Sequence, residues 1–142
     1  MPLVADIAEA VKTDLNGGTF SQPFTAERLY QPLFELPDMQ QLHVTVVPSG
    51  VAVLPATRKQ CFIDVTVDVA VQKKFAQGDA VELDPLMALV EEIRVFFQLQ
   101  RLAAYPSAVW QKTENKPIYA LEHMDELRQF TSVLSLTFRV TH

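Results

Sequence analysis

The sequence predicts an α+β fold: a single antiparallel or mixed β-sheet with two main helices packed on one face. Two long segments carry this prediction, residues 61–72 and 130–140, because apolar and polar residues alternate along both of them. Two further segments, residues 3–15 and the stretch that begins at Asp84, have apolar residues at helical spacing. Long strands with one apolar and one polar face are typical of an antiparallel sheet that is covered on one side only.

The first part of the chain is expected to hold one helix followed by short extended segments. Residues 3–15 place their apolar side chains on one helical face, and Gly17 follows as a helix stop. Extended segments are predicted at 24–30 and 42–47, with an edge segment between them at 33–36. The order of the first elements is therefore a helix and then strands.

Residues 48–59 are predicted to form an exposed hairpin and loop. Pro48, Ser49 and Gly50 are typical turn residues, after which residues 51–54 would begin a return strand. The segment also has a basic pair, Arg58 and Lys59, and few side chains at core spacing. Because rigid elements position loops for contact, these five residues are candidates for contact with partners.

Asp84 and Pro85 predict the start of the second helix, with aspartate as the N-cap and proline at the first helical position. This helix is expected to run to about Leu102. Residues 105–116 would then be a loop, followed by an extended segment at 117–120 and a short helical turn at 121–127. Matching periodicities predict five side chains buried together between the sheet and this helix: Val65, Val67, Ile93, Leu134 and Leu136.

Two aromatic residues of the expected loop, Tyr105 and Trp110, allow two interpretations. Aromatic side chains are common anchors of protein interfaces, so both are candidates for a binding hot spot. Equally, Trp110 would simply close the end of the core.

Composition and length favour one domain that spans residues 1–142. Hydrophobic residues make up 49% of the chain, enough for a core, and a formal net charge of −5 argues against tight binding to duplex DNA. No apolar run reaches the roughly 20 residues of a membrane helix, so no membrane partner is expected. Asp6 and Glu9 argue against an N-terminal signal peptide. The single cysteine, Cys61, is expected to be a small buried thiol in a cytoplasmic protein.

The sequence shows no pattern typical of a catalytic, cofactor-binding or metal site. Asp64 and Asp68 share one face of their predicted strand, but they lie about 13 Å apart at strand rise, too far to act as a pair on one bond. They are expected either to form part of a hydrated outer face or to line an acidic surface with a purpose. Three histidines lack the spacing of a zinc motif: His43, His123 and His142.

The order of these elements supports a resemblance that covers nearly the whole chain. The segments that carry it are D-I-A-E-A-V, F-T-A-E-R-L-Y, L-H-V-T-V-V-P, F-I-D-V-T-V-D-V-A-V-Q-K-K, L-V-E-E-I and Q-F-T-S-V-L-S-L-T-F-R-V. This pattern resembles the tail terminator proteins of long-tailed bacteriophages and prophages, which are also called tail-completion or neck proteins. The resemblance lies in the pattern of elements and not in a catalytic signature.

The resemblance implies a structural virion protein that assembles in the host cytoplasm, has no enzymatic activity and needs no cofactor. Members of the family form a ring, typically a hexamer, at the head-proximal end of the tail tube. The ring stops tube growth and joins tail to head, so the implied partners are further copies of the chain, the tail tube protein and a head-completion or connector protein. DNA would pass through the lumen without specific binding, which suits a pore lined by Asp64 and Asp68.

Alternative functions come from other classes. One is another head–tail part of similar size, either a head-completion adaptor or a tail tube subunit. Another is a small α+β enzyme whose site is assembled across a subunit interface. A ring with a central hole would favour the terminator, whereas a compact monomer or dimer would favour the enzyme.

Overall fold

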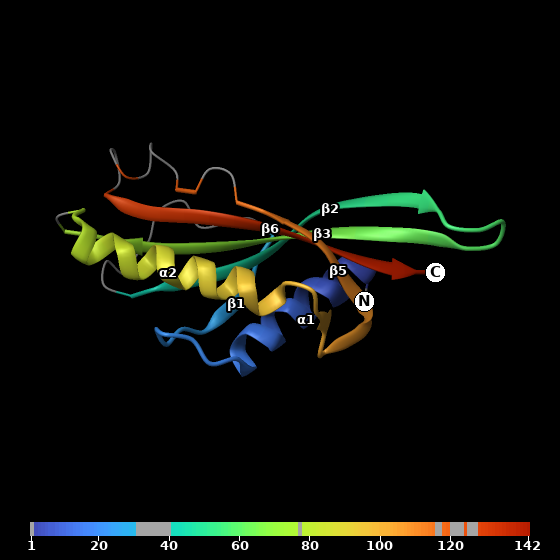
Figure 1. The fold of residues 1–142 in the computed structure, drawn as a ribbon, viewed down its shortest axis with the longest axis horizontal. Helices are drawn as coiled ribbons and strands as arrows, with labels where there is room; N and C mark the ends of the chain where they lie inside the picture. Colours follow the sequence, from blue (N-terminus) through green and yellow to red (C-terminus); the bar gives the residue numbers. More distant parts are fainter. Residues whose placement is uncertain (1, 31–40, 77, 116–117, 120–123, 125–127) are drawn as a thin grey trace.

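A computed structural model describes residues 2–30, 41–76, 78–115, 118–119, 124 and 128–142 of the chain. In this part of the chain, six strands form one sheet in the order β1-β2-β3-β6-β5-β4, and two helices lie on one side of it (Figure 1). The elements are α1 (Leu3–Gly17), β1 (Ala26–Arg28), β2 (His43–Pro55), β3 (Cys61–Lys74), α2 (Ala80–Phe97), β4 (Arg101–Leu102), β5 (Tyr105–Glu114) and β6 (Gln129–Thr141).

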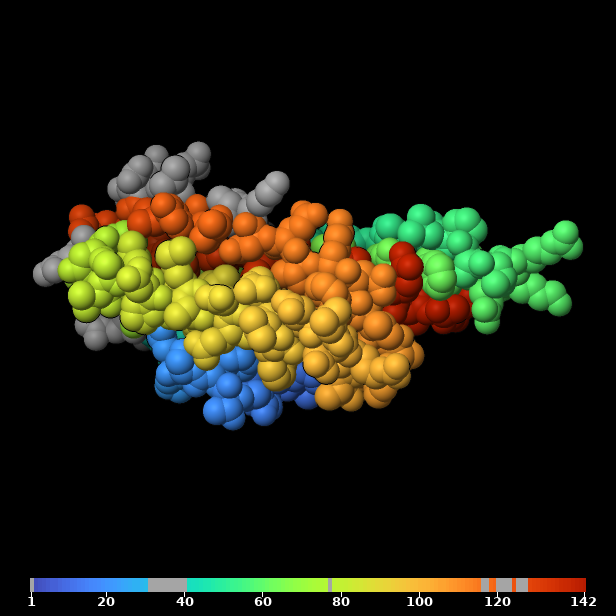
Figure 2. Space-filling view, in the orientation of Figure 1, coloured from blue at the N-terminus to red at the C-terminus, as the bar shows by residue number. Residues whose placement is uncertain are grey.

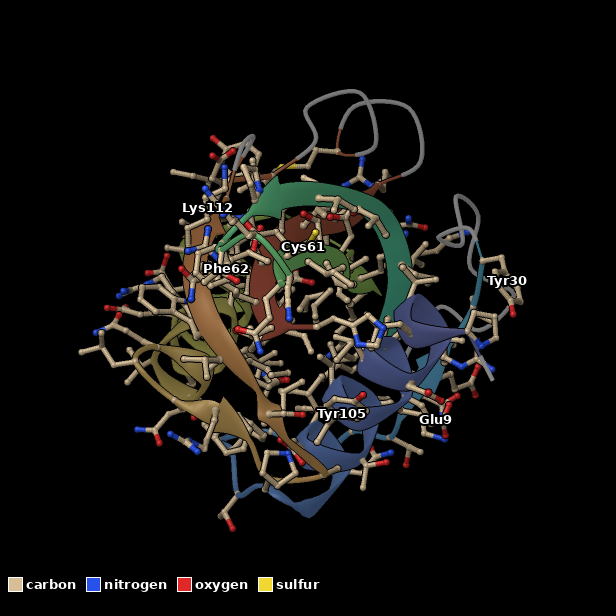
Figure 3. The ribbon with its side chains drawn as sticks, turned by 90° about the vertical axis from the view of Figure 1, so that its right-hand side faces the viewer. Glu9, Tyr30, Cys61, Phe62, Tyr105 and Lys112 are labelled. Atoms are coloured by element: carbon tan, nitrogen blue, oxygen red, sulfur yellow. The ribbon has the colours of Figure 1, made fainter. Side chains whose placement is uncertain are left out.

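The sheet is mixed and strongly curled. β3 and β6 form its centre, paired antiparallel from Phe62 opposite Thr141 to Lys74 opposite Gln129. The pairs β2–β3, β5–β6 and β4–β5 are antiparallel as well, whereas β1 is parallel to β2. Viewed from one end of the molecule, the sheet wraps around the helices as a half-barrel (Figure 3). The prediction of an α+β fold with a single sheet is confirmed, and the curling is an addition to it.

The core lies between the concave face of the sheet and the two helices. β3 and β6 are in register with Val67 opposite Leu136, so alternate residues of both strands point to the same face. α1 adds a buried stripe that includes Ile7 and Val11. The five residues that were predicted to be buried together are all fully buried in this one cluster: Val65, Val67, Ile93, Leu134 and Leu136.

Two side chains near the end of α1 attach neighbouring segments to it. Asn16 accepts a hydrogen bond of 2.7 Å from the backbone N–H of Ala26 and donates one of 3.2 Å to its carbonyl oxygen. Asp14 accepts hydrogen bonds of 2.8 and 3.1 Å from the backbone N–H groups of Ala103 and Ala104, between β4 and β5. These contacts hold the two short edge strands against α1, at opposite edges of the sheet.

The outer face of the sheet is not solvated along its whole length, so the prediction of a sheet covered on one side only is wrong at one end. Thr45, Ala70 and Gln72, which alternate with the core residues of β2 and β3, are between 0% and 2% exposed. Thr131 of β6, opposite Gln72, is buried as well. A polar side chain in a strand pattern therefore does not establish that the face is in contact with water.

The second helix begins before and ends before its predicted bounds. Asp79, and not Asp84, is the N-cap, and its carboxylate accepts a hydrogen bond of 3.1 Å from the backbone N–H of Glu82. Glu82 in turn accepts from the backbone N–H groups of Ala76 and Gly78, an arrangement close to a capping box. Pro85 lies inside the helix, which ends at Phe97 and not near Leu102.

The predicted loop at 105–116 is also wrong, because residues Tyr105–Glu114 form strand β5. β5 pairs with β6, with Trp110 opposite Phe138. Ala108 is the one fully buried residue of β5, so the local pattern of the strand carries little sign of its pairing. The predicted segments at 33–36, 117–120 and 121–127, and with them His123, lie wholly or mostly outside the described residues.

Candidate assembly surface

β2 is a single long strand, so the turn predicted at Pro48, Ser49 and Gly50 is wrong. The strand continues through them with a β-bulge: Pro48 pairs with Val67 and Gly50 pairs with Thr66. The hydroxyl of Ser49, the extra residue, lies 3.2 Å from the carbonyl oxygen of Thr66 and 3.2 Å from a carboxylate oxygen of Asp68. Pairing with β3 thus keeps the chain extended where its local sequence is typical of a turn.

The chain reverses only at residues 56–60, which places a long hairpin outside the body of the protein. We call residues 50–63 of this hairpin the arm; it projects from one end of the molecule (Figures 1 and 2). Val51 pairs with Val65 and Val53 pairs with Ile63, so the core-facing side of the sheet continues into the arm. There the cover of the helices ends, and Val51 is 52% and Val53 is 62% exposed.

The tip of the arm is an ordered turn with a basic pair. The hydroxyl of Thr57 accepts hydrogen bonds from the backbone N–H groups of Lys59 and Gln60, at 3.3 and 3.1 Å. Arg58 and Lys59 are both exposed, and residues 50–63 contain no acidic residue. The arm therefore combines an uncovered apolar face with a positively charged end. Its role as a contact element stays a prediction.

Cys61 lies at the start of β3, in the arm, and its side chain is exposed. The prediction of a buried thiol is therefore wrong. Cys61 does lie on the apolar face of the strand, but at a point beyond the cover of the helices. Figure 3, which views the molecule from the end that bears the arm, shows Cys61 and Phe62 next to each other on it.

The outer face of β3 and β6 carries a row of polar cross-strand pairs. Asp64 accepts two hydrogen bonds from Arg139, at 2.8 and 3.1 Å, and this carboxylate raises the pKa of the Arg139 guanidinium. Asp68 accepts a hydrogen bond of 2.7 Å from the hydroxyl of Ser135. Asp64 and Asp68 are half-buried in this row. Their proposed place at a pore stays a prediction, with the charge of Asp64 paired within the subunit.

Tyr105 is the first residue of β5, and Trp110 lies near the middle of the strand. Both side chains pack against the hydrophobic core. The indole N–H of Trp110 donates a hydrogen bond of 2.8 Å to the hydroxyl of Thr113. Both rings are half-buried, so the contact of Trp110 with the core is established. Whether either ring also meets a partner stays a prediction.

α2 is apolar on its outer side as well as on its buried side. Val95 is 54% and Phe96 is 37% exposed, and both line a groove of about 510 Å³ with Phe20, Ala88 and the two glutamates that follow in the sequence, Glu91 and Glu92. We call this the α2 groove. Glu92 accepts hydrogen bonds from the backbone N–H and the hydroxyl of Ser21, which fixes the loop after α1 at one wall. Sequence reasoning assigned this face to solvent and missed its exposed apolar residues.

The part of the chain that the structure describes shows no metal centre. Within it, no three His, Cys, Asp or Glu side chains are grouped so that they could hold a metal ion. None of the helices described has the length and apolar character needed to span a bilayer. The two described histidines lie apart, His43 on β2 and His142 after β6.

Comparison with known proteins finds a likeness in fold. The chain is similar in fold to the sheath/tube terminator of an extracellular contractile injection system, PVC, in its extended state. The TM-score is 0.51 and the identity 14%, and the match covers 100% of this chain and 57% of that chain. No protein-family model and no curated protein sequence matches the chain. At this identity the likeness shows a shared fold, and this chain spans little more than half the length of that protein.

Proposed function

We propose that this chain is a structural subunit that terminates a tail tube. The observation that carries the proposal is the likeness in fold, over the whole chain, to a sheath/tube terminator. The resemblance in element order points to the same class of protein. In this role the chain acts through assembly alone, without a catalytic step or a cofactor, and its place is in the virion or a related tailed particle.

The exposed apolar surfaces of the chain support an assembled state. Four apolar side chains are each more than half exposed, on the arm, on the outer side of α2 and just after α2: Val51, Val53, Val95 and Leu99. Among the described residues, β1 pairs with β2 only as far as Val46, so the outer edge of β2 beyond it is unpaired. Exposed apolar patches and open strand edges are typical of surfaces that contact other chains.

The finer proposal is a ring of identical subunits at the head-proximal end of the tube, where it stops tube growth and connects the tail to the head. Six copies is the number that the family resemblance favours. Its partners would be further copies of the chain, the tail tube protein and a head-completion or connector protein. DNA would pass through the lumen, where a net charge of −5 per subunit offers phosphates no attraction.

The proposal is tested by removing the gene from the particle that encodes it and measuring tail length by electron microscopy. A terminator predicts tubes of widely varying and often excessive length that carry no heads, with the normal length restored by the gene supplied on a plasmid. Absence of tubes altogether would indicate a tube subunit. Normal tubes beside DNA-filled heads that leak would indicate a head-completion adaptor. Either of these results would contradict the proposal.

A further inference from the structure

The arm has an apolar face that the rest of the subunit does not cover. The face belongs to the same side of the sheet as the core, since Val51 pairs with the fully buried Val65 and Val53 pairs with Ile63. Yet Val51 and Val53 are mostly exposed, at 52% and 62%. In the body of the subunit the helices cover this side of the sheet, whereas in the arm the same side is exposed.

The charges of the arm and of the α2 groove are opposite. The arm ends in Arg58 and Lys59 and holds no acidic residue from 50 to 63. The groove has the carboxylates of Glu91 and Glu92 and no basic residue in its lining. The Glu91 side chain is 70% exposed and pairs with Arg94 of its own helix at 3.4 Å, an exposed contact that contributes little and that an incoming cation can replace. Opposite charge at the two surfaces favours their approach and fixes orientation more than it adds affinity.

The apolar and charged residues follow one another in a matching order along the two surfaces. Along the arm, Val53 and Pro55, the last residue of β2, lie two residues apart, about 7 Å at strand rise, and the basic residues follow in the turn. Along α2, Val95 and Glu91 lie four residues apart, about 6 Å at helix rise. An arm laid along α2 with its tip toward Ala88 therefore places its valines near Val95 and directs its basic tip toward the glutamates.

We propose that the arm of one subunit docks in the α2 groove of a second copy of this chain. Val51 and Val53 pack against Val95 and Phe96, and Arg58 and Lys59 face Glu91 and Glu92. The arm projects from one end of the molecule while α2 lies along the body, so a subunit does not fill its own groove (Figure 2). This inference rests on the proposed ring and names the contact that builds it.

The contact is heterologous, because the arm and the groove are different surfaces of the same chain. Each copy offers its arm to one neighbour and its groove to the other. Such contacts close into a ring when the rotation per subunit divides a full turn, and otherwise form an open helix. The proposed contact is therefore of the kind that a terminating ring requires.

The test uses the single cysteine of the chain, Cys61, which is exposed in the arm. Ala88→Cys adds a thiol in the groove, and a disulfide forms only where the two Cα atoms can approach to within about 7 Å. Under mild oxidation, isolated tails and the purified protein should give a ladder of covalent oligomers, resolved by mass. Their yield should exceed that of the control Val81→Cys, at the exposed start of the same helix, by about tenfold, because docked thiols react as a pair at high effective concentration. A yield no higher than that of the control overturns the docking.

Reversal of the charges at the tip of the arm gives a second test of the docking. Arg58→Glu/Lys59→Glu should lower the cross-linking of Ala88→Cys by about tenfold, and Glu91→Lys added to it should restore most of the yield, since like charges at an interface repel. The matched control, Arg101→Glu/Lys112→Glu, makes the same change of net charge at exposed sites on β4 and β5 and should leave the yield unchanged. Equal effects of both double variants would contradict the docking.

Particles that carry the Ala88→Cys variant separate the two levels of the proposal. Rings of this chain at the tube end, without cross-links through Ala88→Cys, show that the docking is wrong while the terminator role stands. Tails that contain no ring of this chain contradict the terminator role itself. Cross-links in a ladder together with rings support both.

Discussion

Arg139 of β6 donates two hydrogen bonds to the carboxylate of Asp64 on the neighbouring strand β3, at 2.8 and 3.1 Å. The same guanidinium lies 4.3 Å from the centre of the Phe62 ring. The charge of Asp64 is therefore balanced within the subunit. Asp68 accepts hydrogen bonds from the hydroxyls of Ser49 and Ser135. Because both of these donors are neutral, they leave the negative charge of Asp68 unbalanced.

We predict that this face, if it lines the channel, controls how freely DNA passes. Asp64→Lys/Asp68→Lys changes each subunit by +4, from −5 to −1, and should slow DNA ejection, with partial rescue at high salt because the screening length is only about 8 Å at physiological salt. Asp68→Lys alone, which keeps the Asp64–Arg139 pair, should cause a smaller slowing. The measurement is the rate of DNA release from intact particles.

The control for this prediction is Asp84→Lys, which makes the same change of charge as Asp68→Lys at an exposed site on α2, on the opposite side of the sheet from Asp68. It should leave the rate of release unchanged. Normal ejection by the Asp64/Asp68 double variant would place these aspartates outside the lumen.

The core-facing side of β3 gives a prediction on folding. Val67 is fully buried opposite Leu136, so Val67→Asp would place an unpaired carboxylate in the core at a cost of several kcal/mol. We expect that variant not to fold, as judged by circular dichroism and thermal melting. Val51→Asp, the same change on the same face but in the exposed arm, should fold normally. A cooperatively melting Val67→Asp protein would show that the faces of β3 are assigned the wrong way round.

Glu9 on α1 gives a prediction on pH dependence. Hydrogen bonds from Lys12, at 2.5 Å, and Arg28, at 2.8 Å, lower the pKa of Glu9 below its usual 4.5. Since the folded pKa is the lower one, its stabilising effect is complete above about pH 4.5 and is lost as the pH falls through the folded pKa. Glu9 lies at the surface, on the same side of the molecule as Tyr30 (Figure 3), and its side chain is 35% exposed, so the effect is small.

We therefore expect Glu9→Gln to reduce the free energy of unfolding at pH 7 by less than about 1 kcal/mol, as exposed ion pairs do. The difference between the variant and the wild type should shrink as the pH falls, so that it is smaller at pH 3 than at pH 7. Urea unfolding at both pH values measures it. A difference that grows on acidification would contradict the assigned sign.

Leu99, just after α2, gives a prediction on backbone strain. Its φ is 59°, in the left-handed region, and its side chain is 78% exposed. A leucine in this conformation is strained by about 1–2 kcal/mol, part of which a glycine would recover. Leu99→Gly should raise the free energy of unfolding by about 0.5–1 kcal/mol, after the entropy cost of glycine in the unfolded chain. Leu99→Ala, which keeps a Cβ atom, should bring no such gain, and a stabilisation as large as that of glycine would argue against strain.

The sequence predicted best those elements whose own residue pattern reflects which side chains are buried. Alternation along β3 and β6 and the stripe of α2 predicted that Val67, Leu136 and Ile93 meet in the core, and they do. β5 has one fully buried residue, Ala108, so its state is set by pairing with β6 and not by its own pattern. The start of α2 was predicted at the wrong residue because Asp84-Pro85 is also a typical helix start. The N-cap is Asp79, and Glu82 stands three residues after it, as in a capping box.

The candidate site was predictable in part. The basic tip of the arm, Arg58 and Lys59, is exposed as predicted. The bulge at Ser49 could not be distinguished from a turn, because its hydrogen bonds are to β3, far along the chain. The exposed valines of the arm and Cys61 follow the core pattern of their strand, and only the extent of the helices decides that they lie beyond the core.

The most direct test of the terminator role is the position of the chain on its own tail. The protein, tagged at the C-terminus and labelled with gold, is observed by electron microscopy on tails isolated from the particle that encodes it. A terminator predicts label at one end of each tube only, the end that joins the head. Label along the whole length of the tube, at the far end, or absent from complete tails would contradict the proposed function.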